Sequence, residues 1–191
     1  MQYTPSHPYQ TGVNLGGWLS QYSPQFTEAE RLAHFKTFIQ RADIEQIASW
    51  GMDHVRLPVD YSTLEDDASP GLYKENGLAF VDQCLEWCRA AGLAVILDLH
   101  KAPGFAFDDL QSASLFQEPA LQERLLNLWD ALARRYQGQA SYLAFEPLNE
   151  IVLPDSGPWN VLMPKIVQRI RASNPSRIIV GVPQGSRFTE E

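Results

Sequence analysis

Two kinds of hydrophobic pattern alternate along this chain. Short apolar runs bounded by turn formers predict strands at 11–15, 54–59, 93–99, the start of 143–150, and 177–182. Apolar positions three and four residues apart predict helices at 28–39, 43–50, 78–91, 119–136 and 159–172, and residues 66–77 read as loop. The run 93–99 is almost wholly apolar, which is typical of a strand covered on both faces. Alternation of strands with helical segments predicts βαβ units and a parallel sheet.

Polar residues fall at corresponding places in successive units. Asn14 ends the first predicted strand, Arg56 lies in the second, His100 ends the third, and Asn149 and Glu150 follow the fourth. Pro147 cannot donate to a strand ladder, so pairing should weaken just before that last pair. Because the carboxyl ends of parallel strands meet at one edge of the sheet, these side chains are expected to come together.

Each of these residues also has a structural explanation when it is considered alone. Glu150 can be a solvated loop carboxylate, His100 a structural histidine, and Asn14 a residue that holds a turn. Arg56 can pair with Asp60 or with Asp98. The repeated placement at strand ends favours a common site.

Composition narrows the class of partner. The chain has 191 residues, enough for one domain with a core, and its 45% hydrophobic and 20% charged residues are typical of a globular protein. The net charge of -8 disfavours nucleic acid and anionic membranes as partners and suits a neutral ligand. No apolar run reaches the roughly 20 residues of a membrane span. Residues 1–5 carry neither a basic region nor an apolar core, so we expect no signal peptide and, if Met1 is the true start, a cytoplasmic location.

Other chemistries find little support in the motifs. Cys84 and Cys88 lie four residues apart in a helical pattern, where they are expected as buried hydrophobic side chains rather than as a disulfide or metal site. No glycine-rich dinucleotide fingerprint or phosphate loop follows any predicted strand, which weakens a nucleotide-binding interpretation.

Four motifs resemble family 5 of the glycoside hydrolases, the cellulase and glucanase family. They are residues 12–18 (GVNLGGW), 50–58 (WGMDHVRLP), 98–104 (DLHKAPG) and 148–150 (LNE), and the similarity extends from about residue 11 to 182. The resemblance implies a (β/α)₈ TIM barrel and retaining hydrolysis of β-linked glucan or a related polysaccharide, with no cofactor.

The resemblance also implies roles for individual residues. Glu150 matches the general acid/base, Asn149 the residue that binds the sugar 2-hydroxyl, Arg56 the arginine that orients the nucleophile, and His100 a histidine lining the cleavage subsite; we add Asn14 as a further substrate contact. A carboxylic acid with a raised pKa suits this reaction. Loop aromatics can stack on sugar rings or simply pack in the core, namely Trp18, Phe105, Phe107 and Trp159. We take Trp18 as the substrate-binding member.

The sequence departs from the family pattern in one respect. The family's nucleophile is a second glutamate after the seventh strand, whereas only five strands are predicted here, and a TIM barrel takes about 250 residues. We therefore expect residues 1–191 to form a single partial barrel that lacks the nucleophile and is inactive alone. Glu146, the only other acid in the motif, precedes the expected strand end. Open edges at the first and fifth strands would allow self-association or pairing with a completing C-terminal segment.

Two alternatives remain open at this stage. One is a non-catalytic carbohydrate-binding remnant that uses the same aromatic face. The other is a metal-dependent TIM-barrel hydrolase with His100 and Asp98 as ligands, although no second histidine lies near a strand end.

Overall fold

The computed structural model describes residues 9–109, 113–139 and 142–181. Its strands are β1 (Gly12–Asn14), β2 (His54–Asp60), β3 (Ala94–Lys101), β4 (Leu143–Glu146) and β5 (Ile178–Ile179). Its helices are α1 (Glu28–Thr37), α2 (Arg41–Ser49), α3 (Tyr61–Leu64), α4 (Glu75–Ala91), α5 (Pro119–Arg135) and α6 (Gly157–Ser173), with a 3₁₀ turn, η1 (Ser114–Phe116).

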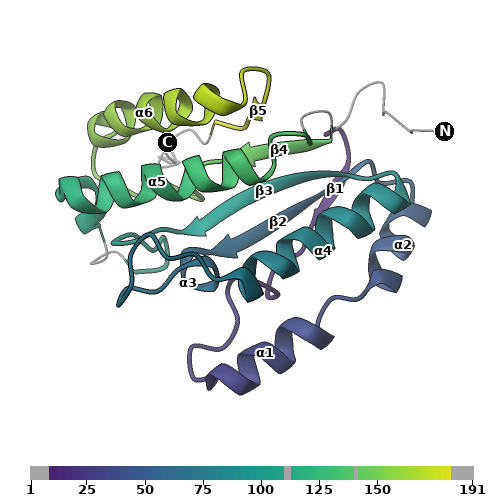
Figure 1. Cartoon of the computed structure of the whole chain (residues 1–191). Helices are drawn as coiled ribbons and strands as arrows, with labels where there is room; N and C mark the ends of the chain where they lie inside the picture. Colours follow the sequence, from purple (N-terminus) through teal and green to yellow (C-terminus); the bar gives the residue numbers. More distant parts are fainter. Residues whose placement is uncertain (1–8, 110–112, 140–141, 182–191) are drawn as a thin grey trace, which may run out of the picture.

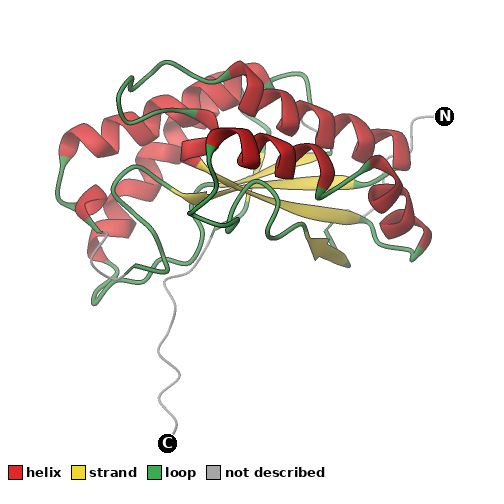
Figure 2. Ribbon diagram, turned by 90° about the horizontal axis from the view of Figure 1, so that it is seen from below, coloured by secondary structure: helices red, strands yellow, loops and turns green. Residues whose placement is uncertain are grey.

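The described strands form one parallel sheet in the order β1-β2-β3-β4-β5 (Figure 1). Strands that follow one another in sequence are therefore neighbours in space, as in the wall of a TIM-type barrel. In Figure 1 helix α4 runs alongside β2 and helix α5 alongside β3 and β4, and Figure 2 shows most helices gathered on one side of the sheet. This arrangement confirms the predicted fold class, while the assignment of residues 1–191 to a single domain stays a prediction.

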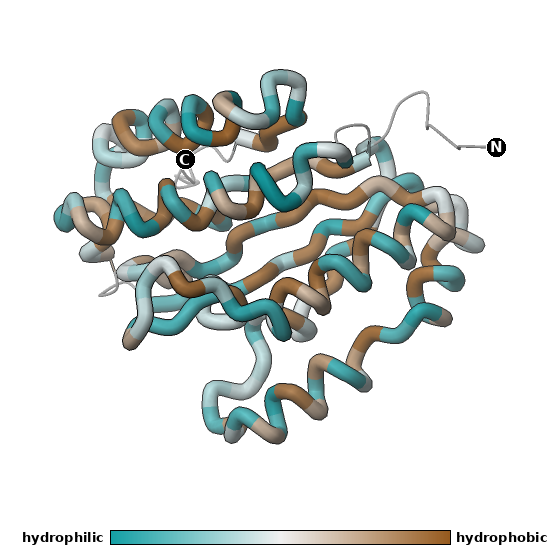
Figure 3. The backbone as a smooth tube through the Cα atoms, in the orientation of Figure 1, coloured by the Kyte–Doolittle hydropathy of each residue, from teal (hydrophilic) through white to brown (hydrophobic). Residues whose placement is uncertain are grey.

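The two faces of the sheet differ in chemistry. The register aligns Asn14 with Arg56, and Asp98 with Glu146, so these polar side chains share one face. The alternate positions form the apolar face, which packs under the helices: Val55, Leu57, Val59, Val95, Leu97, Leu99, Leu143 and Phe145. In Figure 3 the strands are mostly brown, whereas the outer helices alternate teal and brown. The helices thus bury the apolar face, and the polar face is left for a site.

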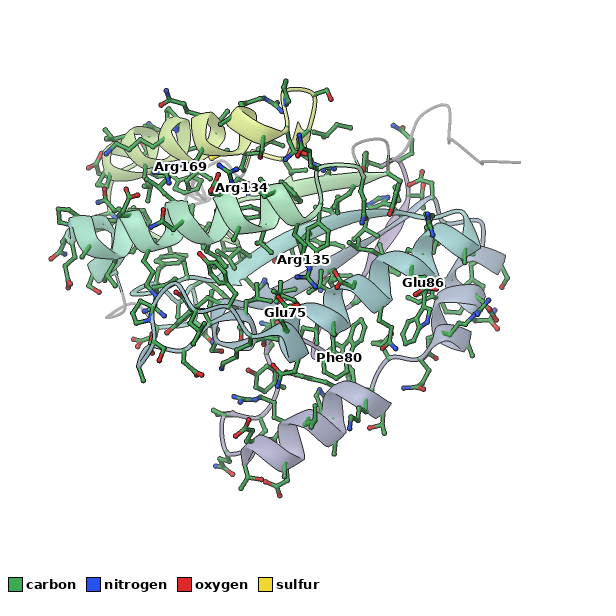
Figure 4. The ribbon with its side chains drawn as sticks, viewed as in Figure 1. Glu75, Phe80, Glu86, Arg134, Arg135 and Arg169 are labelled. Atoms are coloured by element: carbon green, nitrogen blue, oxygen red, sulfur yellow. The ribbon has the colours of Figure 1, made fainter. Side chains whose placement is uncertain are left out.

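Charged side chains link neighbouring helices on the outside of the molecule. Arg135 of α5 binds Asp82 (2.7 Å) and Glu75 (3.1 Å) of α4, and Arg169 of α6 binds Glu123 of α5 (3.0 Å), as Figure 4 helps to place. Exposed pairs of this kind contribute only about 0–1 kcal/mol each. Stability therefore comes mainly from the apolar layer between helices and sheet.

Most boundaries differ by one to three residues from the sequence prediction, and three differences stand out. Helix α3 was not expected, and α4 starts at Glu75 rather than at residue 78. The fifth strand is only Ile178–Ile179, and the side chain of Arg177, just before it, donates to the carbonyl oxygens of Tyr136 (2.6 Å) and Leu143 (2.7 Å). Residue 182, the predicted end of that strand, lies outside the described residues.

The two cysteines and the end of helix α4 lie as the sequence predicts. Cys84 and Cys88 are buried on one face of α4 with their sulfurs 4.0 Å apart and unbridged. Helix α4 ends at Gly92, whose φ of 78° is the left-handed conformation that glycine adopts without strain. No helix in the described part of the chain has both the length and the apolar character needed to cross a membrane.

Candidate active site

Arg56 is the centre of the polar face. Its Nε donates to Glu146 Oε2 at 2.7 Å and its Nη2 to Glu146 Oε1 at 2.9 Å, a two-pronged contact with one carboxylate. The same Nη2 lies 2.9 Å from Asp98 Oδ2. A single guanidinium on β2 thus binds carboxylates from both β3 and β4.

Two amides complete the shell around Arg56. Nη1 donates to Asn14 Oδ1 at 3.1 Å, and Nη2 donates to Asn149 Oδ1 at 2.8 Å. Burial opposes the charge of Arg56, but the hydrogen bond to Glu146 and the charges of Asp98, Glu146 and Glu150 outweigh it and raise the pKa of the guanidinium. Arg56 is therefore a fixed cation that ties together residues from the first four strand units.

Asp98 and His100 form a buried pair on β3. His100 Nδ1 lies 2.7 Å from Asp98 Oδ2, and the Asp98 side chain is 0% exposed. Burial raises the pKa of Asp98 to about 6, against the opposing pull of the His100 hydrogen bond and of Arg56. With Nδ1 held by the carboxylate, His100 presents Nε2, which has no hydrogen-bond partner among the described residues. The edge of its ring meets Phe107 at a centroid distance of 4.8 Å.

After β4 the backbone turns, and the adjacent residues Asn149 and Glu150 lie in this turn at the carboxyl end of the sheet. The N–H of Asn149 donates to Leu99 O at 3.1 Å, which anchors this turn to β3. Asn149 is buried, and its Nδ2 has no hydrogen-bond partner in the described part of the chain. Glu150 is exposed and has a φ of 30°, unusual for a residue other than glycine. Because of this positive φ, Glu150 does not continue the extended conformation of β4.

Most of the predicted site residues are brought together. Asn14, Arg56 and Asn149 are joined by direct hydrogen bonds, and His100 joins them through Asp98. Glu150 follows Asn149 directly, and its charge acts on Arg56. Of the two partners considered for Arg56, the structure has Asp98.

Trp18 does not fit the predicted stacking role. Its side chain is 0% exposed, its Nε1 donates to Phe35 O at 2.8 Å, and its ring is parallel to Trp87 at 6.4 Å. The loop that follows β1 folds under α1, so the indole becomes part of the core. Phe105 and Trp159 are buried as well. Phe107, half-buried beside His100, is the one of the four loop aromatics that is not fully buried.

Sequence reasoning understated two acids. Asp98 and Glu146 are the carboxylates that hold Arg56. From the sequence, Asp98 was considered only as a partner of Arg56 or as a metal ligand, and Glu146 was given no role. The signal was the two-residue alternation: Asp98 and His100 share a face of β3, and Asp98 is in register with Glu146. Among the described residues, no three His, Cys, Asp or Glu side chains form a group suited to a metal ion, while Asp98 and His100 bind each other.

Comparison with known proteins gives the family. The family model described as cellulase (glycosyl hydrolase family 5) matches residues 14–186. Endoglucanase C of Acetivibrio thermocellus is 47% identical over 169 residues, covering 88% of this chain and 48% of that protein. Cellodextrinase A of Ruminococcus flavefaciens is 41% identical over 173 residues, again covering 88% of this chain and 48% of that protein. The chain thus spans about half the length of the curated relatives it matches.

Solved structures agree with this assignment. A hyperthermophilic endo-β-1,4-glucanase in complex with substrate superimposes with a TM-score of 0.71 at 26% identity, covering 91% of this chain and 51% of that one. Rutinosidase from Aspergillus niger has a TM-score of 0.76 at 21% identity and covers 94% of this chain and 63% of that one, which shows a shared fold. The family model spans most of the chain, and the chain belongs to glycosyl hydrolase family 5, the cellulase family.

Proposed function

We propose that this chain contributes the acid/base half of a retaining glycosidase site that acts on the O-glycosyl bonds of a β-linked glucan. The observation that carries the proposal is the Asn149–Glu150 pair, anchored to β3 through Leu99 O and set beside the Arg56 cation. The names of the relatives, an endoglucanase and a cellodextrinase, support a polysaccharide or oligosaccharide substrate.

Glu150 is the proton donor in this proposal. It is the exposed carboxyl group of the site and can reach a leaving-group oxygen, whereas Asp98 and Glu146 are buried against Arg56. Protonated, it assists departure of the aglycone, and as a carboxylate it then activates water. Asn149 Nδ2, buried and without a partner in the described residues, is a donor for a sugar hydroxyl.

Retention requires a second carboxyl group about 5–5.5 Å from the first. Glu146 is a poor nucleophile because Arg56 occupies both of its oxygens. In this proposal Glu146 and Asp98 hold Arg56 in place, and Arg56 orients a nucleophile that comes from a further segment or from a second chain. Among the described residues β5 has a partner strand on one side only, and its other side is where such a segment would add.

The proposal predicts binding without turnover for the 191-residue chain used alone. Purified chain should bind cello-oligosaccharides in an NMR titration and release no reducing sugar from β-glucan. Adding a C-terminal segment of a related enzyme, with its seventh-strand glutamate, should start hydrolysis with retained anomeric configuration. Robust hydrolysis by the chain alone would contradict this division of roles and make Glu146 the first residue to re-examine.

Glu150→Gln tests the acid/base assignment in the complemented enzyme. The substitution keeps size and removes the proton donor, so hydrolysis of a glucan with a poor leaving group should fall about 100-fold or more, with a much smaller loss on an activated aryl glycoside. Glu86→Gln is the matched control, because Glu86 is exposed on α4, away from the strand ends (Figure 4). An equal loss on both substrates would show that Glu150 is not the acid.

A non-catalytic carbohydrate-binding role is the second candidate. It is favoured by the buried, unpartnered polar atoms of His100 and Asn149 in the described residues, which need saccharide hydroxyls but no second carboxylate. Failure of complementation, with saccharide binding intact, would favour this role over the enzyme.

A further inference from the structure

A third buried acid lies at the same edge as Arg56 and His100. Asp60 is the last residue of β2, 8% exposed, and its N–H donates to Leu19 O at 3.1 Å. The register between β2 and β3 shifts after Val59, so Asp60 aligns with Lys101 rather than with His100. The carboxyl ends of β2 and β3 lie side by side next to α3 (Figure 1).

Unpartnered polar atoms concentrate around Asp60. Asp60 Oδ1, Ser20 Oγ and His100 Nε2 are all buried and have no hydrogen-bond partner among the described residues. Ser20 directly follows Leu19, which bridges to Val59 and accepts from Asp60. Buried polar atoms are nearly always hydrogen-bonded, so a group of exceptions at one strand edge points to a ligand.

The groups around Asp60 set the pKa of its carboxyl group and so decide whether it can accept a hydrogen bond. Burial raises its pKa to about 6, while Lys101, His100 and the backbone N–H of Gln21 lower it and Asp108 raises it further. Lys101 is held elsewhere, because its Nζ lies 2.6 Å from Asp108 Oδ2. At neutral pH Asp60 is therefore largely ionised, with one oxygen that no described side chain binds.

A sugar hydroxyl is a suitable hydrogen-bond donor to the unpaired carboxylate oxygen of Asp60. A carboxylate accepts strong hydrogen bonds from O–H groups, and Ser20 Oγ and His100 Nε2 can donate to or accept from neighbouring hydroxyls. The Phe107 ring, in contact with His100 and 5.7 Å from Lys101 Nζ, adds an apolar surface of the kind that packs on a pyranose ring.

We propose that Asp60, together with Ser20 and His100, forms a hydroxyl-binding subsite for one sugar ring of a β-linked glucan, on the β2 side of the position served by Glu150. The inference rests on the proposed function, since it takes the same substrate class, and it adds a specificity-determining carboxylate that none of the motifs indicated.

The alternative is a purely structural role for Asp60. The carboxylate also accepts from the Gln21 backbone, and Gln21 has a φ of 54°, so Asp60 helps to hold an unusual turn. That role predicts lower stability in Asp60 variants and no selective effect on any one sugar hydroxyl. The two roles therefore differ in how they respond to the ligand.

The test is an NMR titration of the 191-residue chain with cellotetraose, and in parallel with laminaritetraose, at pH 7.5. Asp60→Ala should weaken binding of the preferred oligosaccharide about 10- to 100-fold, the usual effect of a hydrogen bond to a charged group. Asp60→Asn, which keeps the shape, should weaken it less. Asp130→Asn on α5, which neutralises a half-buried acid paired with Arg134, is the control and should leave binding unchanged.

Singly deoxygenated methyl cellobiosides supply the decisive readout. The unsubstituted chain should discriminate about tenfold against the one analogue that lacks the hydroxyl facing Asp60, and Asp60→Ala should bind that analogue and its parent equally. Circular dichroism of each variant establishes that it is folded. If Asp60→Ala proves unfolded, Asp60→Asn must reduce the same discrimination.

The outcomes separate this inference from the proposed function. Loss of binding in Asn149→Ala, with full binding and full discrimination in both Asp60 variants, would overturn the Asp60 subsite and leave the glycosidase proposal standing. Absence of binding to every oligosaccharide would overturn both.

Discussion

Replacing Arg56 by alanine should destabilise the fold as well as impair the site. The change removes the cation between Asp98, whose side chain is 0% exposed, and Glu146, whose side chain is 9% exposed. Losing one partner of a buried ion pair costs about 3–5 kcal/mol. Because the Arg56 side chain is itself 22% exposed, water can enter, and we expect a cost of about 3 kcal/mol. For a chain of this size that lowers Tm by roughly 6–12 °C.

The pH dependence of this loss follows from the acids left behind. Without Arg56 the folded-state pKa of Asp98, already raised to about 6, rises further, so the folded state binds a proton that the unfolded state has released. Stability of the variant therefore falls as pH rises through this range, and its deficit relative to the unsubstituted chain should be small near pH 4 and largest above pH 7. Arg56→Lys should recover only part of the loss, because an ammonium cannot make the two-pronged contact with Glu146.

Thermal and urea unfolding at pH 4, 6 and 8 measure this directly. Arg134→Ala is the control, since Arg134 makes an exposed pair with Asp130 within α5 and should leave the transition unchanged. An Arg56→Ala chain with unchanged stability at pH 8 would refute the view that Arg56 compensates the buried acids.

Three further predictions concern single side chains. His100→Ala should weaken oligosaccharide binding about tenfold in an NMR titration, because Nε2 has no hydrogen-bond partner among the described residues and is available to a sugar hydroxyl. It should also lower Tm, because it removes the Nδ1 hydrogen bond to buried Asp98. Burial raises the folded-state pKa of Asp98 from 3.8 to about 6, so the unfolding free energy of the unsubstituted chain should fall by about 2–3 kcal/mol between pH 4 and 7. Asp98→Asn removes the titrating group and should largely abolish this fall. Trp18→Ala should lower the free energy of unfolding in urea by about 3–5 kcal/mol, because the indole lies in the core. For the same reason Trp18→Phe should retain saccharide binding.

The periodicity of the chain was sufficient to predict the sheet. The nearly continuous apolar run at 93–99 became the central strand β3, and pairing of β4 stops at Glu146, one residue before Pro147, as the missing N–H predicts. Placing polar residues at successive strand ends was likewise enough to predict that Arg56 and Asn149 meet. Local patterns carry this information because a parallel sheet repeats the same geometry in each unit.

What the sequence could not supply were features set by tertiary packing. Trp18 occupies a loop after a strand, where an aromatic can face solvent or core with equal local preference, and the packing of α1 and α4 around it decides that it is buried. The register shift after Val59 depends on how β2 meets the loop at Leu19. A shift of one residue changes which side chains are neighbours, so the place of Asp60 beside Lys101 could not be deduced from alternation.

Unpaired polar atoms on the polar face lower the stability of the fold, and a binding role explains why they are present. Five buried side chains at one sheet edge keep an atom without a hydrogen-bond partner among the described residues: Ser20, Asp60, Asp98, His100 and Asn149. Each such atom lowers the stability of the folded chain by about 1–3 kcal/mol relative to a hydrogen-bonded one. The requirements of folding alone do not explain why these atoms are unpaired. A saccharide that supplies several hydroxyls at once would satisfy these atoms together, so binding should raise the Tm of the chain. The same atoms discriminate against ligands that lack a matching hydroxyl, because a buried polar group left unpaired weakens the complex more than a lost apolar contact does.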